Sequence, residues 1–171
     1  EMRGKELNPA DLSGSGTIKI SHGLLYEFPI IASVFNVMDL QFPRQAPITD
    51  AYGTFETRTG ALRINDLLLT GGTVPMHMEG KVGLKNGISF KKQKIDLLVT
   101  AARADGLLDR IPLVGLVKHY TLDLFRRLAM QVRIEGTVGN YRTDRLASPV
   151  TKPIERMWSL MEKLAPSLPE R

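Results

Sequence analysis

The chain has 171 residues, of which 43% are hydrophobic and 24% charged, and it contains no cysteine. Since a domain has ~150 residues on average, this length predicts one domain, or one domain with a short appendage. The absence of cysteine excludes a disulfide scaffold, a thiolate zinc site and a cysteine nucleophile. The net charge of +5 is mild and scattered, so it does not indicate a nucleic-acid partner.

The first predicted element is a strand over residues 14–21, where polar and apolar residues alternate from Thr17 to Ser21. Alternation with period two is typical of a strand with one apolar face and one wet face. A short buried helix over residues 29–38 is expected next. Pro29 is a favoured first helical residue, and apolar side chains follow it at a spacing that suits such a helix.

Four further strands are predicted over residues 48–59, 61–70, 73–84 and 93–101. In the third of them every even position is apolar or glycine, a pattern that helical periodicity cannot produce. Strands spaced this closely are predicted to be antiparallel, since parallel pairs need long crossovers. Gly, Asn and Asp tolerate the positive φ of tight turns, and they divide these runs at Thr59-Gly60, Asn65-Asp66, Gly71-Gly72 and Asn86-Gly87.

The C-terminal part mixes helix and strand. Residues 105–125 combine aliphatic side chains with a proline and a glycine, which predicts one or two short helices around a proline break. The alternating run 128–139 predicts a sixth strand. An amphipathic helix over residues 153–164 is expected last, behind a hinge marked by Pro149 and Pro153.

These elements predict a mainly β fold with minor α. We expect a curved antiparallel sheet that forms a half-pipe or open barrel, with two short helical segments and the C-terminal amphipathic helix. The expected domain organisation is a β-sheet domain over residues 1–148, followed by a proline-hinged helix and tail over residues 149–171.

The motifs that the sequence lacks favour a non-enzymatic protein. The sequence contains no phosphate-binding loop, no nucleophile elbow and no zinc-protease motif. His22, His77 and His119 lie far apart in the sequence, which favours separate surface or half-buried side chains over a metal site. We therefore expect no catalytic residues, no metal and no cofactor.

Two basic clusters, Lys91–Lys94 and Arg126-Arg127, raise the possibility of nucleic-acid binding. The neighbouring aromatic residues do not interleave with them as a stacking platform requires. A charged turn that blunts a strand edge is the favoured interpretation of these lysines and arginines. No nucleic-acid partner is expected.

Methionine and aliphatic residues share the apolar faces of the predicted strands, and methionine lines adaptable apolar surfaces. An ordinary core and a lipid-binding groove both require such a face, so the pattern leaves these two interpretations open. The candidate groove residues are Ile18, Ile20, Leu62, Ile64, Val74, Met76, Met78, Val82, Leu97, Val99, Met130, Val132 and Ile134.

An ordered succession of short motifs runs through residues 10–140. Gly14–Leu25 has glycines and aliphatic residues at strand spacing, and the proline-led Phe28–Ile31 follows it. The later motifs are Phe55–Leu69, Val74–Leu84, Asp96–Val99, Ile111–Gly115 and Val132–Val138. This succession resembles the C-terminal region of AsmA-like proteins, the envelope family that includes AsmA and TamB.

The resemblance implies a periplasmic part of an inner-membrane-anchored protein of a diderm bacterium. Its implied fold is a curved sheet with an apolar groove, and its implied role is the binding or transport of phospholipid or another acyl lipid between the inner and outer membranes. No catalytic residues are implied. Because the sequence starts at Glu1 with no signal peptide and no apolar stretch of ~20 residues, we expect a soluble piece of a longer protein.

A structural or protein-interaction end cap that carries no lipid is the alternative. It follows if the predicted helices cover the apolar sheet face completely. The amphipathic helix over residues 153–164 supports this alternative, because its apolar side offers a contact surface for an envelope protein or a membrane. Its contact candidates are Ile154, Met157, Trp158, Met161 and Leu164.

Overall fold

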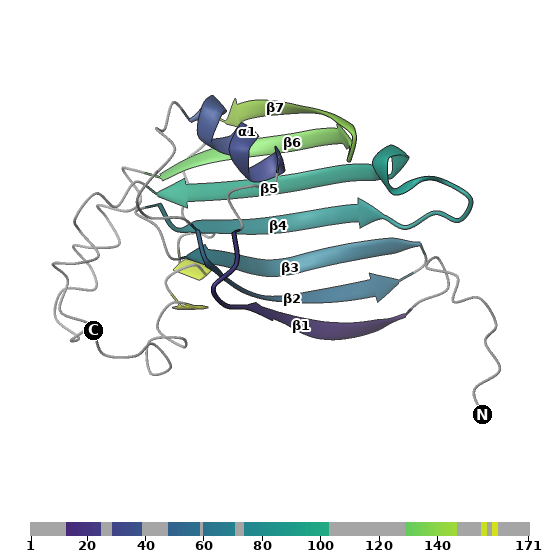
Figure 1. Cartoon of the computed structure of the whole chain (residues 1–171), viewed down its shortest axis with the longest axis horizontal. Helices are drawn as coiled ribbons and strands as arrows, with labels where there is room; N and C mark the ends of the chain where they lie inside the picture. Colours follow the sequence, from purple (N-terminus) through teal and green to yellow (C-terminus); the bar gives the residue numbers. More distant parts are fainter. Residues whose placement is uncertain are drawn as a thin grey trace, which may run out of the picture.

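The computed structural model describes residues 13–24, 29–38, 48–58, 60–70, 74–102, 129–146, 155–156 and 159–160. Within this part of the chain, seven strands form one antiparallel sheet in which each strand pairs with its neighbours in the sequence (Figure 1). The strands are β1 Gly14–Ile20, β2 Asp50–Arg58, β3 Ala61–Thr70, β4 Met76–Gly83, β5 Lys94–Ala102, β6 Ala129–Thr137 and β7 Asn140–Leu146. The edge strands β1 and β7 do not pair, so the sheet is open. The predicted mainly β, antiparallel fold is confirmed.

The six predicted strands correspond to β1 through β6, whereas β7 was not predicted. This strand follows β6 through the two-residue turn Val138-Gly139, and Thr137 pairs with Asn140 across it. Its sequence is largely polar, and charged residues occur on both of its faces, so it has no apolar alternation from which it could be recognised. Polar and charged residues are common at sheet edges because they discourage pairing with other chains.

The helix predicted over residues 29–38 is present as α1, Pro29–Val37. It lies beside β7 and crosses the sheet near β6 and β7 (Figure 1). Ile31, Val34 and Phe35 form its buried side. A single 3-10 turn, η3 (Phe90–Lys92), lies between β4 and β5. Within the described residues, no helix is long and apolar enough to cross a membrane.

The other two predicted helical segments lie largely outside the residues that the structure describes. Residues 105–125 lie outside the described part of the chain. Of the helix predicted over residues 153–164, residues 155–156 and 159–160 are helical. The contact candidates of that helix also lie outside the described residues: Ile154, Met157, Trp158, Met161 and Leu164.

A β-bulge in β3 replaces the turn expected at Asn65-Asp66. Relative to β4, Ile64 pairs with Gly80 and Leu67 pairs with Met78, so β3 has one extra residue between these pairs. An extra residue shifts the alternation of side chains by one position. The bulge therefore brings Leu67 and Leu69 onto the same sheet face as Leu62 and Ile64.

Candidate functional site

The cross-strand register assigns each strand residue to one of two sheet faces, because directly paired residues point to the same side. We call the first the apolar face; one of its rows is Ile18, Gly53, Leu67, Met78, Val99 and Val132. The opposite, polar face carries the row Ser15, Glu56, Arg63, Lys81, Asp96, Glu135 and Arg142.

The register brings the sequence-predicted groove candidates together. Twelve of the thirteen lie on strands and belong to the apolar face. Val74 precedes β4 and is buried in the same apolar cluster. The alternation of residue types thus locates one continuous apolar surface from β1 to β6.

Burial divides this surface into two regions. Over β4, β5 and β6 most of the candidates are buried, and Val99, Val132 and Ile134 are 0% exposed. Toward β1 the surface opens: Ile18 is half-buried and Ile20 is 39% exposed. The buried candidates are Val74, Met76, Met78, Leu97, Val99, Val132 and Ile134; the half-buried ones are Ile18, Leu62, Ile64, Val82 and Met130.

The closed region is an ordinary hydrophobic core. Ile31, Val34 and Phe35 of α1, together with Met38, belong to the same cluster of buried side chains as the residues of β4 to β6. Burying a side chain such as Phe35 stabilises the fold by about 1.5–3 kcal/mol. In this region the protein's own side chains fill the space against the sheet.

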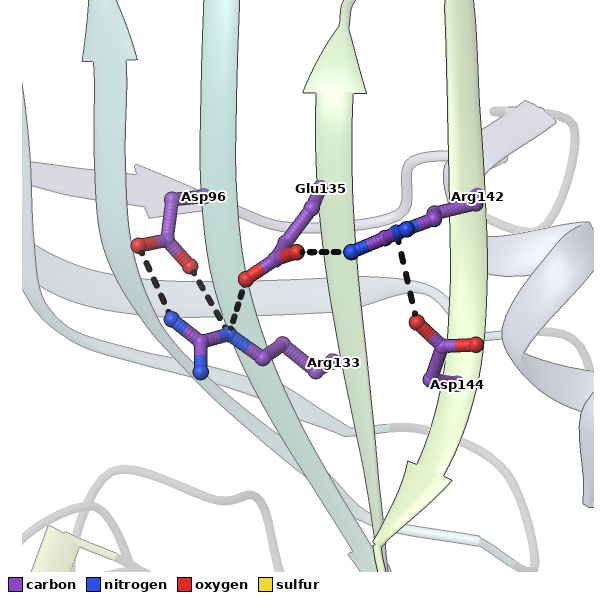
Figure 2. Close-up of polar contacts among 5 residues, drawn as sticks. All are labelled: Asp96, Arg133, Glu135, Arg142 and Asp144. Atoms are coloured by element: carbon purple, nitrogen blue, oxygen red, sulfur yellow. Dashed lines mark hydrogen bonds and ion pairs between the residues drawn. The ribbon is translucent and has the colours of Figure 1, made fainter.

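The polar face carries a ladder of ion pairs across β5, β6 and β7, drawn in Figure 2. Asp96 and Glu135 pair directly across the strands, where two like charges repel each other. Arg133 lies between them: its Nε is 3.3 Å from Asp96 Oδ1 and 2.6 Å from Glu135 Oε1. Arg142 extends the ladder, with 2.8 Å to Glu135 Oε2 and 3.5 Å to Asp144 Oδ2.

These contacts raise the pKa of both arginines. Hydrogen bonding to Asp96, followed by the attraction of Asp96 and Glu135, raises the pKa of Arg133. Hydrogen bonding to Glu135, followed by the attraction of Asp144 and Glu135, raises the pKa of Arg142. Because the partners are largely exposed, such pairs orient side chains and neutralise repulsion more than they stabilise the fold.

One row of the polar face is buried, contrary to the expectation of a uniformly wet face. Leu68 and His77 are 0% exposed and Thr100 is 1% exposed. His77 was expected to be a surface or half-buried residue, and this prediction is wrong. Its Nε2 lies 2.9 Å from Asp66 Oδ1, so Nε2 carries the proton, since a carboxylate can only accept. Within the described residues, His77 Nδ1 is a buried atom without a hydrogen-bond partner.

A hollow of about 690 Å³ lies beside the bulge on the polar face. Its lining includes Asp66 and Glu79, and Arg156 from the helical residues 155–156. Arg156 donates to Glu79 Oε2 at 2.7 Å, which places this residue against the polar face. In the described part of the chain, no three His, Asp or Glu side chains come together to hold a metal ion.

A scan against family models and searches of curated proteins and of solved structures found no match for this chain. The physical properties of the two sheet faces therefore carry the functional argument.

Two buried polar side chains, His77 and Gln93, were not predicted from the sequence. His77 occupies a polar-face position of β4, and alternation alone assigns such positions to solvent. Gln93 is also buried, at 5% exposed, within a segment interpreted as a charged turn. No property of the sequence distinguishes these two side chains from their solvated neighbours, because alternation assigns a side chain to a sheet face and does not report what covers that face.

Proposed function

We propose that this chain binds acyl lipid, such as phospholipid, against the β1–β3 part of its apolar face. The observation that carries the proposal is the change in burial along that face: Val99 is 0% exposed, whereas Ile20 on the edge strand is 39% exposed. An apolar surface that continues from a packed core to an open edge can cover an acyl chain. Each methylene that leaves water contributes about 0.8 kcal/mol.

The proposed setting is a larger AsmA-like envelope protein of the periplasm, to which residues 10–140 bear the resemblance described above. Its role would be to bind phospholipid or to pass it between the inner and outer membranes, without catalysis. The hydrophobic effect is non-directional, so an acyl chain could slide along such a surface without a specific site.

A half-pipe shape belongs to the same proposal. Gly53 and Gly80 support it, because at both positions an added Cβ would collide with the backbone of the neighbouring strand. Glycines where strands approach this closely mark bends in sheets.

The test is lipid extraction of the purified chain followed by mass spectrometry, and titration with a fluorescent phospholipid. The variant Ile18→Glu/Ile20→Glu adds two charges to the apolar face of β1. Its matched control, Ser15→Glu/Thr17→Glu, adds the same two charges to exposed positions on the opposite face of that strand. We expect the first variant to lose lipid binding and the control to keep it.

Two results would overturn the proposal: a wild-type chain that neither carries nor saturably binds lipid, or equal binding by both variants. Far-UV circular dichroism shows whether each variant is folded. If the double change at Ile18 and Ile20 unfolds the sheet, Ile20→Asn alone makes the comparison, because this side chain already contacts water.

The second candidate function is an end cap or protein-interaction module that holds no lipid. The observation that favours it is the packing of α1 in one core with β4 to β6, which closes the larger part of the apolar face. Deleting residues 150–171 and measuring the oligomeric state tests this function. A change of oligomeric state in a chain without lipid would favour the end cap.

A further inference from the structure

The connection between β4 and β5 combines exposed apolar side chains with positive charge. Ile88 is 41% exposed and Phe90 is 64% exposed. We call residues 84–94 the basic loop; it contains no Asp or Glu and has four exposed lysines: Lys85, Lys91, Lys92 and Lys94. The connection protrudes beyond the strand ends at the right of Figure 1.

The basic loop is braced by its own hydrogen bonds. The buried side chain of Gln93 accepts from Lys85 N–H through Oε1 at 2.9 Å. Its Nε2 donates to the carbonyls of Lys85 at 2.7 Å and of Ile88 at 3.0 Å. Lys92 N–H donates to Ser89 O at 2.8 Å, which closes η3. These hydrogen bonds hold the loop in a conformation in which the side chains of Ile88 and Phe90 are exposed to solvent.

Neighbouring turns fix the basic loop to the end of the sheet. Leu84 N–H donates to Gly60 O at 2.7 Å, and Gly139 N–H donates to Lys91 O at 2.7 Å. Arg58, at the end of β2, is also exposed and adds a fifth cation at this end. A rigid support of this kind lowers the ordering cost of any contact that the loop makes.

We propose that the basic loop docks on an anionic lipid bilayer, with Ile88 and Phe90 in the interfacial layer and the lysines at the headgroups. Apolar contact and electrostatic attraction to anionic lipid act together at such surfaces. The lysines can keep their ammonium groups among the headgroups while their stems lie along the apolar layer. The docking surface is separate from the lipid-binding face of β1–β3, so it does not depend on the proposed function.

Single-stranded nucleic acid is the other polyanion that such a loop could meet. Recognition of that kind uses successive aromatic side chains on which bases stack. The basic loop has one aromatic residue, Phe90, and its second exposed apolar side chain, Ile88, is aliphatic. These side chains suit the apolar layer of a membrane better than a run of bases.

Vesicle flotation of the full 171-residue chain tests the proposal. Vesicles of equal phosphatidylcholine and phosphatidylglycerol are compared with pure phosphatidylcholine at low and high NaCl. Since each lysine near an anionic surface contributes about a factor of five in affinity, Lys91→Gln/Lys92→Gln should weaken binding to the anionic vesicles about 25-fold. The matched control Lys19→Gln/Arg145→Gln removes the same charge from exposed positions near the opposite end of the sheet.

The apolar part of the contact is tested separately with Ile88→Ser/Phe90→Ser, for which we expect at least about a tenfold loss of affinity on the same vesicles. Because the chain has no cysteine, Ser89→Cys carries a single environment-sensitive fluorophore into the loop. Its emission should increase and shift to the blue on anionic vesicles. The same label at exposed Ser21, just beyond the opposite end of β1, should not respond.

The proposal is wrong if the loop variants bind vesicles as the control does, or if the label at position 89 stays in water while the chain floats. It is also wrong if the vesicles do not bind and a single-stranded oligonucleotide does. If these variants lose vesicle binding while the amount of lipid extracted from the chain stays unchanged, the membrane contact is supported independently of the proposed lipid-binding face.

Discussion

Replacing Gly80 with alanine tests how closely β4 approaches β5 across the apolar face. Gly80 has a φ of 145°, a conformation that side chains with a Cβ rarely adopt. A Cβ at this position would collide with the carbonyl oxygen of Asp96 and lie 2.8 Å from Leu97 Cα. Both obstacles are backbone atoms of the adjacent strand, which cannot move aside as a flexible side chain could.

The expected loss of stability follows from two contributions. An unfavourable φ costs about 1–3 kcal/mol, and overlap with a packed neighbour costs about 1–3 kcal/mol more. Gly80→Ala should therefore lower the free energy of unfolding by about 4 kcal/mol, a large part of the roughly 5–15 kcal/mol of a typical domain. Urea unfolding followed by far-UV circular dichroism measures this difference.

Alanine substitutions at two other glycines separate the cost of the unfavourable φ from the cost of the overlap with the neighbouring strand. Gly87 has a φ of 66° but nothing within 4 Å of its Cβ position, so Gly87→Ala should cost only about 1–2 kcal/mol. Gly14 has open space and no positive φ, so Gly14→Ala should change stability by less than about 1 kcal/mol. Equal losses at Gly80 and Gly87 would refute the close approach of β4 and β5, and equal losses at Gly80 and Gly14 would refute the whole argument.

Three further outcomes are expected. Met76→Glu places a charge where the side chain is 0% exposed, so it should cost about 3–5 kcal/mol and yield unfolded or insoluble protein on expression. Gln93→Ala should cost about 2 kcal/mol, because two carbonyls and one N–H lose their hydrogen bonds to this buried side chain, and should speed amide hydrogen exchange in residues 84–93. Arg133→Gln should leave the urea midpoint almost unchanged, since exposed ion pairs contribute little; a large shift would show that the repulsion between Asp96 and Glu135 dominates this region.

Period-two alternation predicted most of the sheet because it reports a physical requirement of each strand. In β4 and β6 one face packs in the hydrophobic core, so Met76, Met78, Val132 and Ile134 fall at alternate positions. The same requirement is absent in β7, whose side chains lie at an edge and need no apolar alternation. A strand of this type is set by its hairpin partner β6 and escapes any search based on its own sequence.

The burial of individual residues could not be predicted from alternation. Val99 and Ile20 both occupy apolar-face positions, yet the first is 0% and the second 39% exposed. The difference depends on where α1 meets the sheet, and strand periodicity contains no information on that position. For the same reason His77 was predicted to lie at the surface or half-buried, although it belongs to a buried row of the polar face.

The strand register at the bulge in β3 is a third feature that the sequence indicated only in part. Asn and Asp are common in turns and are also accommodated at bulges, so Asn65-Asp66 indicated an interruption without specifying its kind. The structure resolves this ambiguity, because Thr54 pairs with Asp66 and Phe55 pairs with Ile64, which leaves Asn65 unopposed. The hydrophobic residues on either side confirm the bulge: Leu62 and Ile64 have even numbers, whereas Leu67 and Leu69 have odd ones.

The dimensions of the open part of the apolar face limit what it could carry. β1 has seven residues, which at about 3.3 Å per residue extend roughly 23 Å. Three strands spaced about 4.8 Å apart span roughly 10 Å. This is the upper limit of the open width, since Ala51 and Leu69 are already buried at one end of β2 and β3. One leaflet of a bilayer core is about 15 Å thick, so one or two extended acyl chains would cover this surface. A lipid on this chain would therefore be held by its tails alone, with the headgroup left in water. To leave this chain, the lipid would have to pass to a further apolar surface beside β1, or to the membrane that the basic loop is proposed to contact.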